Sequence, residues 1–125
     1  MPRNILIVDD TSSCSDTLAI ALASLPGINI HIVSSAREAL VAMSETPMAA
    51  VVTDLQMPRI DGFELIRRIR LQERYATIPI LVISGDSDLT TPDRARRTGA
   101  TAFFAKPFSP NAIRRTLEQL LYENR

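Results

Sequence analysis

The sequence lacks several features that mark secreted and membrane proteins. It has one cysteine, Cys14, so no intrachain disulfide can form, and this fits a reducing cytoplasm. No apolar run approaches the roughly 20 residues that a membrane-spanning helix needs. The four-residue apolar run after Asn4 is too short for the core of a secretory signal. We therefore expect a cytoplasmic protein that has no contact with a membrane.

The sequence also lacks a net charge and any sign of division into parts. Its 14 basic and 14 acidic side chains cancel, whereas a nucleic-acid-binding domain normally carries a basic excess. We therefore expect no direct binding of nucleic acid. The 125 residues contain no internal repeat and no Gly/Ser/Pro-rich linker, and this length suits a single core. One domain is expected over residues 1–125.

Short apolar runs alternate with amphipathic segments along the chain. Four runs are continuously apolar, which is typical of parallel strands covered on both faces: residues 5–8, 49–52, 80–83 and 102–105. The run at residues 28–33 alternates isoleucine with polar residues, which predicts an edge strand with one wetter face. His31, the only histidine, is interpreted as a solvated residue of that strand and not as a ligand.

The segments between the runs have helical spacing of apolar residues. Four stripes share this spacing: Leu18, Leu22 and Leu25; Ala36, Ala39, Leu40 and Met43; Leu65, Ile66 and Ile69; and Ile113, Leu117, Leu120 and Leu121. Helix-start signals agree with them at Ser35 with Glu38, Asp61 with Glu64, and Ser109 before Pro110. Together with a weaker fifth helix, the alternation predicts an α/β fold with a doubly wound, five-stranded parallel sheet and five helices.

The fifth helix precedes the last strand and is weakly specified. Over residues 89–99 only Leu89 and Ala95 are apolar. Thr91 as a cap and Gly99 as a stop predict a short helix that is rich in arginine. Because little apolar surface anchors it, we expect this element to be mobile.

Polar residues follow four of the predicted strands. They are Asp9 and Asp10 after the first strand, Asp54 after the third, Ser84 after the fourth and Lys106 after the fifth. The carboxyl ends of parallel strands face one side of a sheet, so these groups should meet on one rim. Adjacent carboxylates repel one another, and Mg²⁺ would offset that repulsion. The set predicts an aspartyl-phosphate site, although each residue alone also suits a helix cap, a loop or a turn.

These motifs, with their spacing, resemble the receiver domain of bacterial two-component response regulators over essentially the whole chain. The matching segments are Asp9-Asp10, Asp54-Leu55-Gln56-Met57-Pro58, Asp61-Gly62, Ile83-Ser84-Gly85, Gly99-Ala100 leading to Phe103, and Lys106-Pro107-Phe108. The resemblance implies a flavodoxin-like sheet with strand order 2-1-3-4-5. It also implies a phosphorylation switch that is not an enzyme and catalyses only its own phosphoryl acceptance and autodephosphorylation.

The resemblance assigns roles to the acidic residues. It implies that Asp54 accepts the phosphoryl group. Mg²⁺, or Mn²⁺ in its place, would be bound by Asp10, Asp54 and the backbone carbonyl of Gln56, with Asp9 acting mainly through a bound water. As a hypothesis, the side chains of Gln56 and Asp86 flank the phosphoryl group and set its rate of hydrolysis.

The resemblance also assigns the lysine and the switch residues. Lys106 would pair with Asp54 and then with the phosphoryl group, and a cis peptide bond before Pro107 would aim it. Ser84 would be the switch hydroxyl, and Phe103 the aromatic ring that turns inward when Ser84 moves. Many members have tyrosine where this chain has Phe103, so a reporting phenol hydroxyl is missing.

Further positions of the motifs are placed outside the site. Asp61 and Gly62 are assigned to a helix cap and a tight turn, and Met57-Pro58 to the shape of the loop. Members that bind DNA and dimerise through their last helices often have two aspartates where this chain has Thr101-Ala102, so we do not expect their salt-bridged dimer.

The implied phosphoryl donor is a histidine kinase or a histidine phosphotransfer protein, and the output partner stays open. Within the family, the alternative is a receiver module of a larger hybrid kinase or DNA-binding regulator. An aspartyl-nucleophile phosphatase would need a second acid two residues after the first, whereas Asp9 and Asp10 are adjacent. A flavodoxin-like cofactor module is disfavoured because residues 10–14 begin with an acid and contain no glycine.

Overall fold

A computed structural model describes residues 3–57 and 59–123, apart from the side chains of residues 12–14 and 123. Its strands form one parallel sheet in the order β2-β1-β3-β4-β5, which confirms the expected fold class and strand order. The elements, in chain order, are β1 (Arg3–Val8), α1 (Ser12–Leu22), β2 (Ile28–Val33), α2 (Ala36–Glu45), β3 (Ala50–Asp54), α3 (Gly62–Arg70), a 3₁₀ turn (Glu73–Tyr75), β4 (Ile80–Ser84), α4 (Thr91–Thr98), β5 (Ala102–Ala105), α5 (Pro110–Glu118) and a π-helical turn (Gln119–Glu123).

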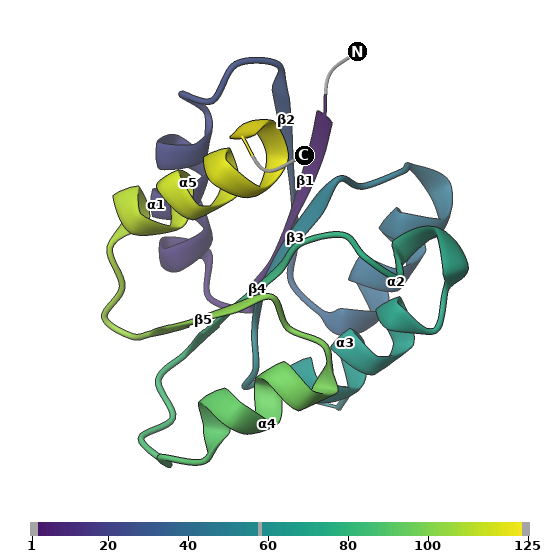
Figure 1. The fold of residues 1–125 in the computed structure, drawn as a ribbon, viewed down its shortest axis with the longest axis vertical. Helices are drawn as coiled ribbons and strands as arrows, with labels where there is room; N and C mark the ends of the chain where they lie inside the picture. Colours follow the sequence, from purple (N-terminus) through teal and green to yellow (C-terminus); the bar gives the residue numbers. More distant parts are fainter. Residues whose placement is uncertain (1–2, 58, 124–125) are drawn as a thin grey trace.

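Helices cover both faces of the sheet (Figure 1). Helices α1 and α5 lie together on one face, and α2, α3 and α4 lie on the other. Each face has its own apolar core, to which the predicted helical stripes contribute. The stripe residues of the first core are Leu18, Leu22, Leu25, Ile113 and Leu117, and those of the second are Ala36, Ala39, Met43, Leu65, Ile66 and Ile69.

The structure corrects one expectation about each edge strand: the burial of β5 and the surroundings of His31 in β2. Strands β3 and β4 are buried at every position, but β5 lies at the edge, where Phe103 is half-buried and Ala105 is exposed. The interpretation of residues 102–105 as a strand covered on both faces was therefore wrong, because a continuous apolar run does not distinguish a central strand from an edge strand. Strand β2 is the other edge, as predicted, but His31 is half-buried with Nε2 3.1 Å from Asn4 Oδ1, and is not a freely solvated side chain.

The predicted helix starts are confirmed in three cases. The side chains of Ser35, Asp61 and Ser109 accept hydrogen bonds from the backbone N–H three residues on, at 3.1, 2.9 and 3.2 Å. Thr91 was predicted as the cap of α4, and this was wrong by one residue, because Thr90 stands at the cap position. The Thr91 side chain instead turns inward and is 4% exposed.

Helix α4 is anchored by more than its few apolar residues. Its end at Gly99, with φ of 129°, is confirmed. The guanidinium of Arg70 on α3 donates to the carbonyl of Gly99 from Nε at 3.0 Å and from Nη2 at 2.8 Å. The guanidinium of Arg94 stacks 3.9 Å above the centre of the Phe63 ring. Polar and cation–π contacts therefore fasten α4 to α3, and the mobility expected for residues 89–99 stays a prediction.

The buried Tyr75 hydroxyl joins the 3₁₀ turn to the end of α2 and to the loop after α2, which leads to a test of stability. It donates to the carbonyl of Met43 at 2.7 Å and accepts from the Met48 N–H at 3.2 Å. We expect Tyr75→Phe to lower the free energy of unfolding by about 1–3 kcal/mol, because it leaves a buried N–H unpaired. Urea denaturation measures this change.

The matched control is Tyr122→Phe. In the wild-type protein the Tyr122 hydroxyl donates to the carbonyl of Pro26 at 2.6 Å, and this bond is exposed to solvent. Water can replace that bond, so a loss of less than about 1 kcal/mol is expected. Equal losses in the two variants would contradict the role given to Tyr75.

Candidate functional site

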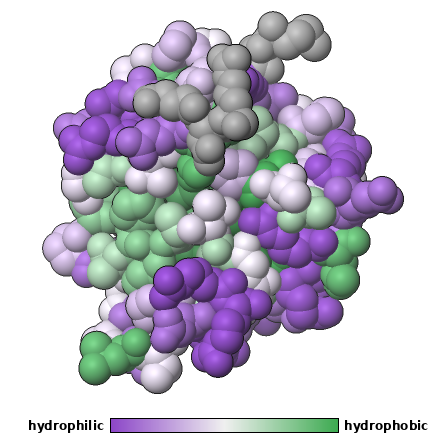
Figure 2. Space-filling view, in the orientation of Figure 1, coloured by the Kyte–Doolittle hydropathy of each residue, from purple (hydrophilic) through white to green (hydrophobic). Residues whose placement is uncertain are grey.

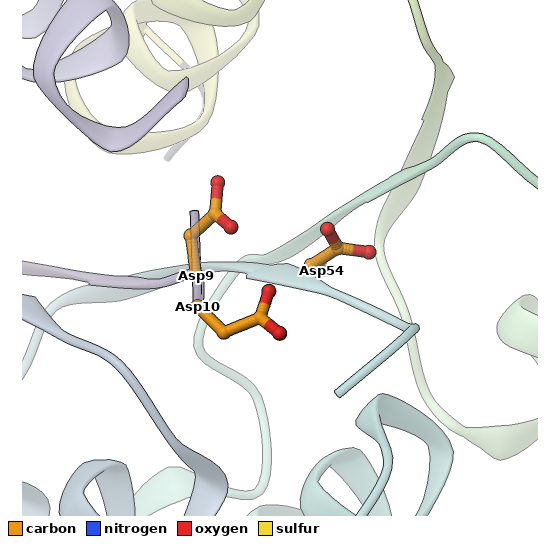
Figure 3. Close-up of side chains that lie close together, drawn as sticks. All are labelled: Asp9, Asp10 and Asp54. Carbon is orange, nitrogen blue, oxygen red and sulfur yellow. The ribbon is translucent and has the colours of Figure 1, made fainter. Parts of the chain in front are cut away.

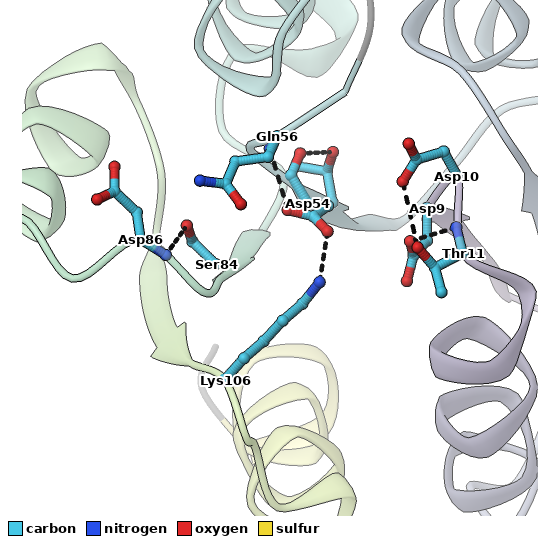
Figure 4. A network of polar contacts seen from close by, with 9 residues as sticks. Asp9, Asp10, Thr11, Asp54, Gln56, Ser84, Asp86 and Lys106 are labelled. Atoms are coloured by element: carbon cyan, nitrogen blue, oxygen red, sulfur yellow. Dashed lines mark hydrogen bonds and ion pairs between the residues drawn. The ribbon is translucent and has the colours of Figure 1, made fainter.

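Asp54, the last residue of β3, lies at the centre of the rim. Its side chain is only 5% exposed. Lys106 Nζ donates to its Oδ2 at 2.6 Å, and the backbone N–H of Gln56 donates to its Oδ1 at 3.0 Å (Figure 4). A buried charge is tolerated only when it is paired and hydrogen-bonded, and these two contacts meet both conditions. They also hold the carboxylate in one orientation.

The loop after β3 packs tightly against the same residue. A Cβ added to Gly62 would lie 2.5 Å from the Asp54 carbonyl oxygen and 2.6 Å from Leu55 Cα, so only glycine fits there. The requirement is one of space, and it lets α3 begin directly against the end of β3. Met57 is buried in the core at 8% exposure, in keeping with its assignment to loop shape, and Pro58 lies outside the described residues.

Asp9 and Asp10 directly follow β1 and form a cluster with Asp54 (Figure 3). One carboxylate oxygen from each residue lies within 4.8 Å of those of the other two. Asp9 is half-buried and accepts a hydrogen bond from the Thr11 N–H at 2.8 Å, whereas Asp10 is exposed. Burial is the main cause that raises the pKa of the Asp9 carboxyl; the Thr11 N–H opposes the increase, and the Asp54 charge adds to it.

The donor set of the cluster suits a hard divalent cation. Three carboxylates face the single ammonium of Lys106, which is already bonded to Asp54. Mg²⁺ takes oxygen ligands from one or two carboxylates and keeps positions for water and phosphate oxygens. The residues present therefore fit Mg²⁺. The roles of Asp9, Asp10, Asp54 and the Gln56 carbonyl as its ligands stay predictions.

Ser84 and Lys106 reach the rim from the neighbouring ends of β4 and β5. Ser84 is fully buried, and its carbonyl accepts a hydrogen bond from the Lys106 N–H at 2.9 Å. The Lys106–Pro107 peptide bond is cis, as the resemblance implied. Phe103 is half-buried and packs against the core on the α4 side of the sheet. The switch roles of Ser84 and Phe103 remain predictions.

Asp86 lies in a hydrogen-bond network that the sequence did not indicate. Its Oδ1 accepts from the Asp88 N–H at 2.9 Å, and its Oδ2 accepts from the Thr91 hydroxyl at 3.1 Å. Neither this network nor the contact between Asp9 and Thr11 was expected. The sequence offers only a weak signal for them, because Asp, Ser and Thr side chains often bond backbone groups two residues further on.

Comparisons with known proteins agree on one family. A sequence model described as the response regulator receiver domain matches residues 5–118. The chain is 35% identical to the C4-dicarboxylate transport transcriptional regulatory protein DctD of Pseudomonas aeruginosa, over 97% of this chain and 27% of DctD. It is 30% identical to the transcriptional regulatory protein FixJ of Bradyrhizobium diazoefficiens, over 94% of this chain and 56% of FixJ. The chain thus spans about half, or less, of the length of these relatives.

Solved structures give the same result. The chemotaxis response regulator CheY4 of Vibrio cholerae has 27% identity and a TM-score of 0.86, over 97% of this chain and all of that one. The signal receiver domain of a histidine kinase from Syntrophus aciditrophicus has 28% identity and a TM-score of 0.87, over 98% and 92%. Among the described residues no helix is long and apolar enough to cross a membrane. The chain belongs to the response regulator receiver domain family.

Proposed function

We propose that the chain is a phosphoacceptor switch of a two-component phosphorelay in which Asp54 accepts the phosphoryl group. The strongest support is the environment of Asp54: a nearly buried carboxylate, bonded to Lys106 and close to two further carboxylates. The proposed donor is a phosphohistidine of a histidine kinase or histidine phosphotransfer protein. The chain would catalyse only its own phosphorylation and dephosphorylation.

In the proposed transfer, a carboxylate oxygen of Asp54 bonds to phosphorus while the bond from phosphorus to the donor's imidazole nitrogen breaks. The bonding electrons stay with that nitrogen. The Lys106 ammonium, bonded to Asp54 at 2.6 Å before transfer, then donates to the phosphoryl oxygens. Mg²⁺ bound by Asp10, Asp54 and the Gln56 carbonyl, with Asp9 acting through water, would neutralise part of the charge on those oxygens.

The proposed output is a rearrangement on the side of α4 and β5. Ser84 moves toward the phosphoryl group, and Phe103 fills the space that it leaves. Figure 2 shows an apolar area over β5, beside the strongly polar surface of α4, and this face would present the change to a partner. The half-burial of Phe103 at the edge strand supports the proposal, because an edge residue can change its packing without opening the central core.

A role within a larger protein is the second candidate. Two observations support it: the chain spans only 27% of the length of DctD and 56% of that of FixJ, and it is similar to the receiver domain of a histidine kinase. We therefore propose that residues 1–125 form one receiver domain, either alone or beside an output or kinase domain. A cytoplasmic location is proposed because the single cysteine fits a reducing compartment.

Phosphorylation at Asp54 can be tested by intact-mass measurement after incubation with Mg²⁺ and acetyl phosphate. The wild-type protein should gain the mass of one phosphoryl group, and Asp54→Asn should gain none because an amide oxygen is a poor nucleophile. Asp16→Asn, which changes an exposed acid outside the cluster, is the matched control and should gain the group. An equal gain in wild type and Asp54→Asn would exclude Asp54 as the acceptor.

Metal binding can be tested without phosphorylation. If Mg²⁺ relieves the repulsion among the carboxylates, about 100-fold excess over its dissociation constant should add about 2.7 kcal/mol to the free energy of unfolding. Asp10→Asn should lose most of this gain, and Asp16→Asn should keep it. Urea denaturation with Mg²⁺ or with EDTA measures both effects. A gain of the same size in Asp10→Asn would show that the ion acts elsewhere.

A further inference from the structure

The loop between β4 and α4 connects the buried Ser84 hydroxyl to the first turn of α4 through one residue. The Asp86 N–H donates to Ser84 Oγ at 3.1 Å (Figure 4). The Asp86 carboxylate accepts from the Thr91 hydroxyl, also at 3.1 Å. Ser84 is fully buried and Thr91 is 4% exposed, whereas Asp86 is exposed, so each bond joins Asp86 to a buried hydroxyl. Asp86 is therefore bonded to the rim by its backbone and to α4 by its side chain.

Other contacts in this loop hold Asp86 in place. Its Oδ1 accepts from the Asp88 N–H at 2.9 Å, so both of its carboxylate oxygens are engaged. Asp88 in turn accepts from the N–H and the hydroxyl of Thr90 at 2.9 and 2.8 Å, and its carbonyl accepts from the Thr91 N–H at 3.2 Å. Hydrogen bonds thus link the residues of this loop to one another, and both oxygens of the Asp86 carboxylate take part in them.

The far end of α4 is fixed independently. Gly99 is bonded to Arg70 of α3, and Ala95 is fully buried in the core between the helices and the sheet. A displacement that enters through Thr91 would therefore act on the first turn of α4 while the last turn stays attached to α3. The helix is thus bonded to the rim at its first turn and to α3 at its end, with the contact of Arg94 to the Phe63 ring between them.

We propose that Asp86 is a positioning residue that holds the Ser84 hydroxyl in its resting place and carries its displacement to α4 through Thr91. The proposal rests on the phosphorylation of Asp54. When Ser84 moves to donate its hydroxyl to the phosphoryl group, its Oγ draws the bonded Asp86 N–H along. Asp86 is thereby displaced, and the Thr91 hydroxyl transmits the displacement to α4. The role assigned to Asp86 is one of hydrogen bonding, and it does not require the carboxylate's charge to act on the phosphoryl group.

Substitution of Thr91 tests the transmission. Amide hydrogen exchange of Thr91 and of residues 93–95 is measured with and without acetyl phosphate and Mg²⁺, and intact mass reports the adduct on Asp54. In wild type we expect phosphorylation to change these rates roughly 5-fold, the scale of one lost hydrogen bond. Thr91→Val removes the hydroxyl but little volume, and should keep the adduct while losing at least half of that change. Thr91→Ser, which restores a hydroxyl, should recover it.

Two controls separate this role from others. Thr98→Val removes a hydroxyl that donates within α4 to the Arg94 carbonyl at 2.8 Å, and should leave the response intact. Asp86→Asn keeps an acceptor for the Asp88 N–H, and its amide N–H can donate to the Thr91 hydroxyl, which then accepts. It should therefore behave as wild type, whereas Asp86→Ala should lose the response. If the carboxylate's charge acted on the phosphoryl group, both Asp86 variants would change the decay of the adduct alike, and the proposal would be overturned.

The outcomes also separate this proposal from the proposed function. If wild type forms no adduct, phosphorylation at Asp54 fails and the positioning role fails with it. If the adduct forms and Thr91→Val responds as fully as wild type, only the positioning role is overturned. A partial loss in Thr91→Val that Thr91→Ser does not recover would assign the effect to packing, and would overturn it as well.

Discussion

The ion pair between Asp54 and Lys106 is the interaction on which the site depends. It joins the end of β3 to the end of β5 at 2.6 Å, around a carboxylate that is only 5% exposed. Removal of one partner from such a pair typically costs about 3–5 kcal/mol, because the other charge is left buried and uncompensated. Loss of Lys106 would cost more here, because Asp9 and Asp10 lie close to the carboxylate that would be left without its partner. The strand order brings the two partners together, and the tight turn at Gly62 lets α3 begin directly against the strand end that carries Asp54.

Much of the fold could be predicted because local and global signals agree. The caps at Ser35, Asp61 and Ser109 are short-range hydrogen bonds between residues three apart, so their spacing in the sequence is sufficient. The rim could be predicted for a similar reason, since a parallel sheet places the residues after each strand on the same side. Asp54 and Lys106, which are 52 residues apart, are brought together by topology alone.

The remaining features depend on which of several similar residues or strands takes a given place in the fold, and residue spacing does not reveal this. Thr90 and Thr91 are adjacent and chemically identical, and the inward turn of Thr91 is decided by the position of Asp86. The exposure of β5 depends on which strand lies at the edge, not on its own apolar composition. Helix α4 is anchored by Arg70, which bonds to Gly99, and by Arg94, which stacks on Phe63. A search for apolar residues overlooks both contacts, because arginine is charged although much of its side chain can pack. The network around Asp86 likewise depends on how the loop folds, which residue spacing does not specify.

The same long-range pairing has a consequence for the order of folding. Asp9, Asp10 and Asp54 come together when β1 and β3 pair, but the lysine that compensates them arrives only with β5, near the end of the chain. A partly folded form that lacks β5 therefore contains the repulsion without its counter-charge. Since contacts distant in sequence also form late, the electrostatics of the site disfavour incomplete sheets and favour the finished one. The grouping proposed for phosphoryl transfer would thereby also make folding more cooperative.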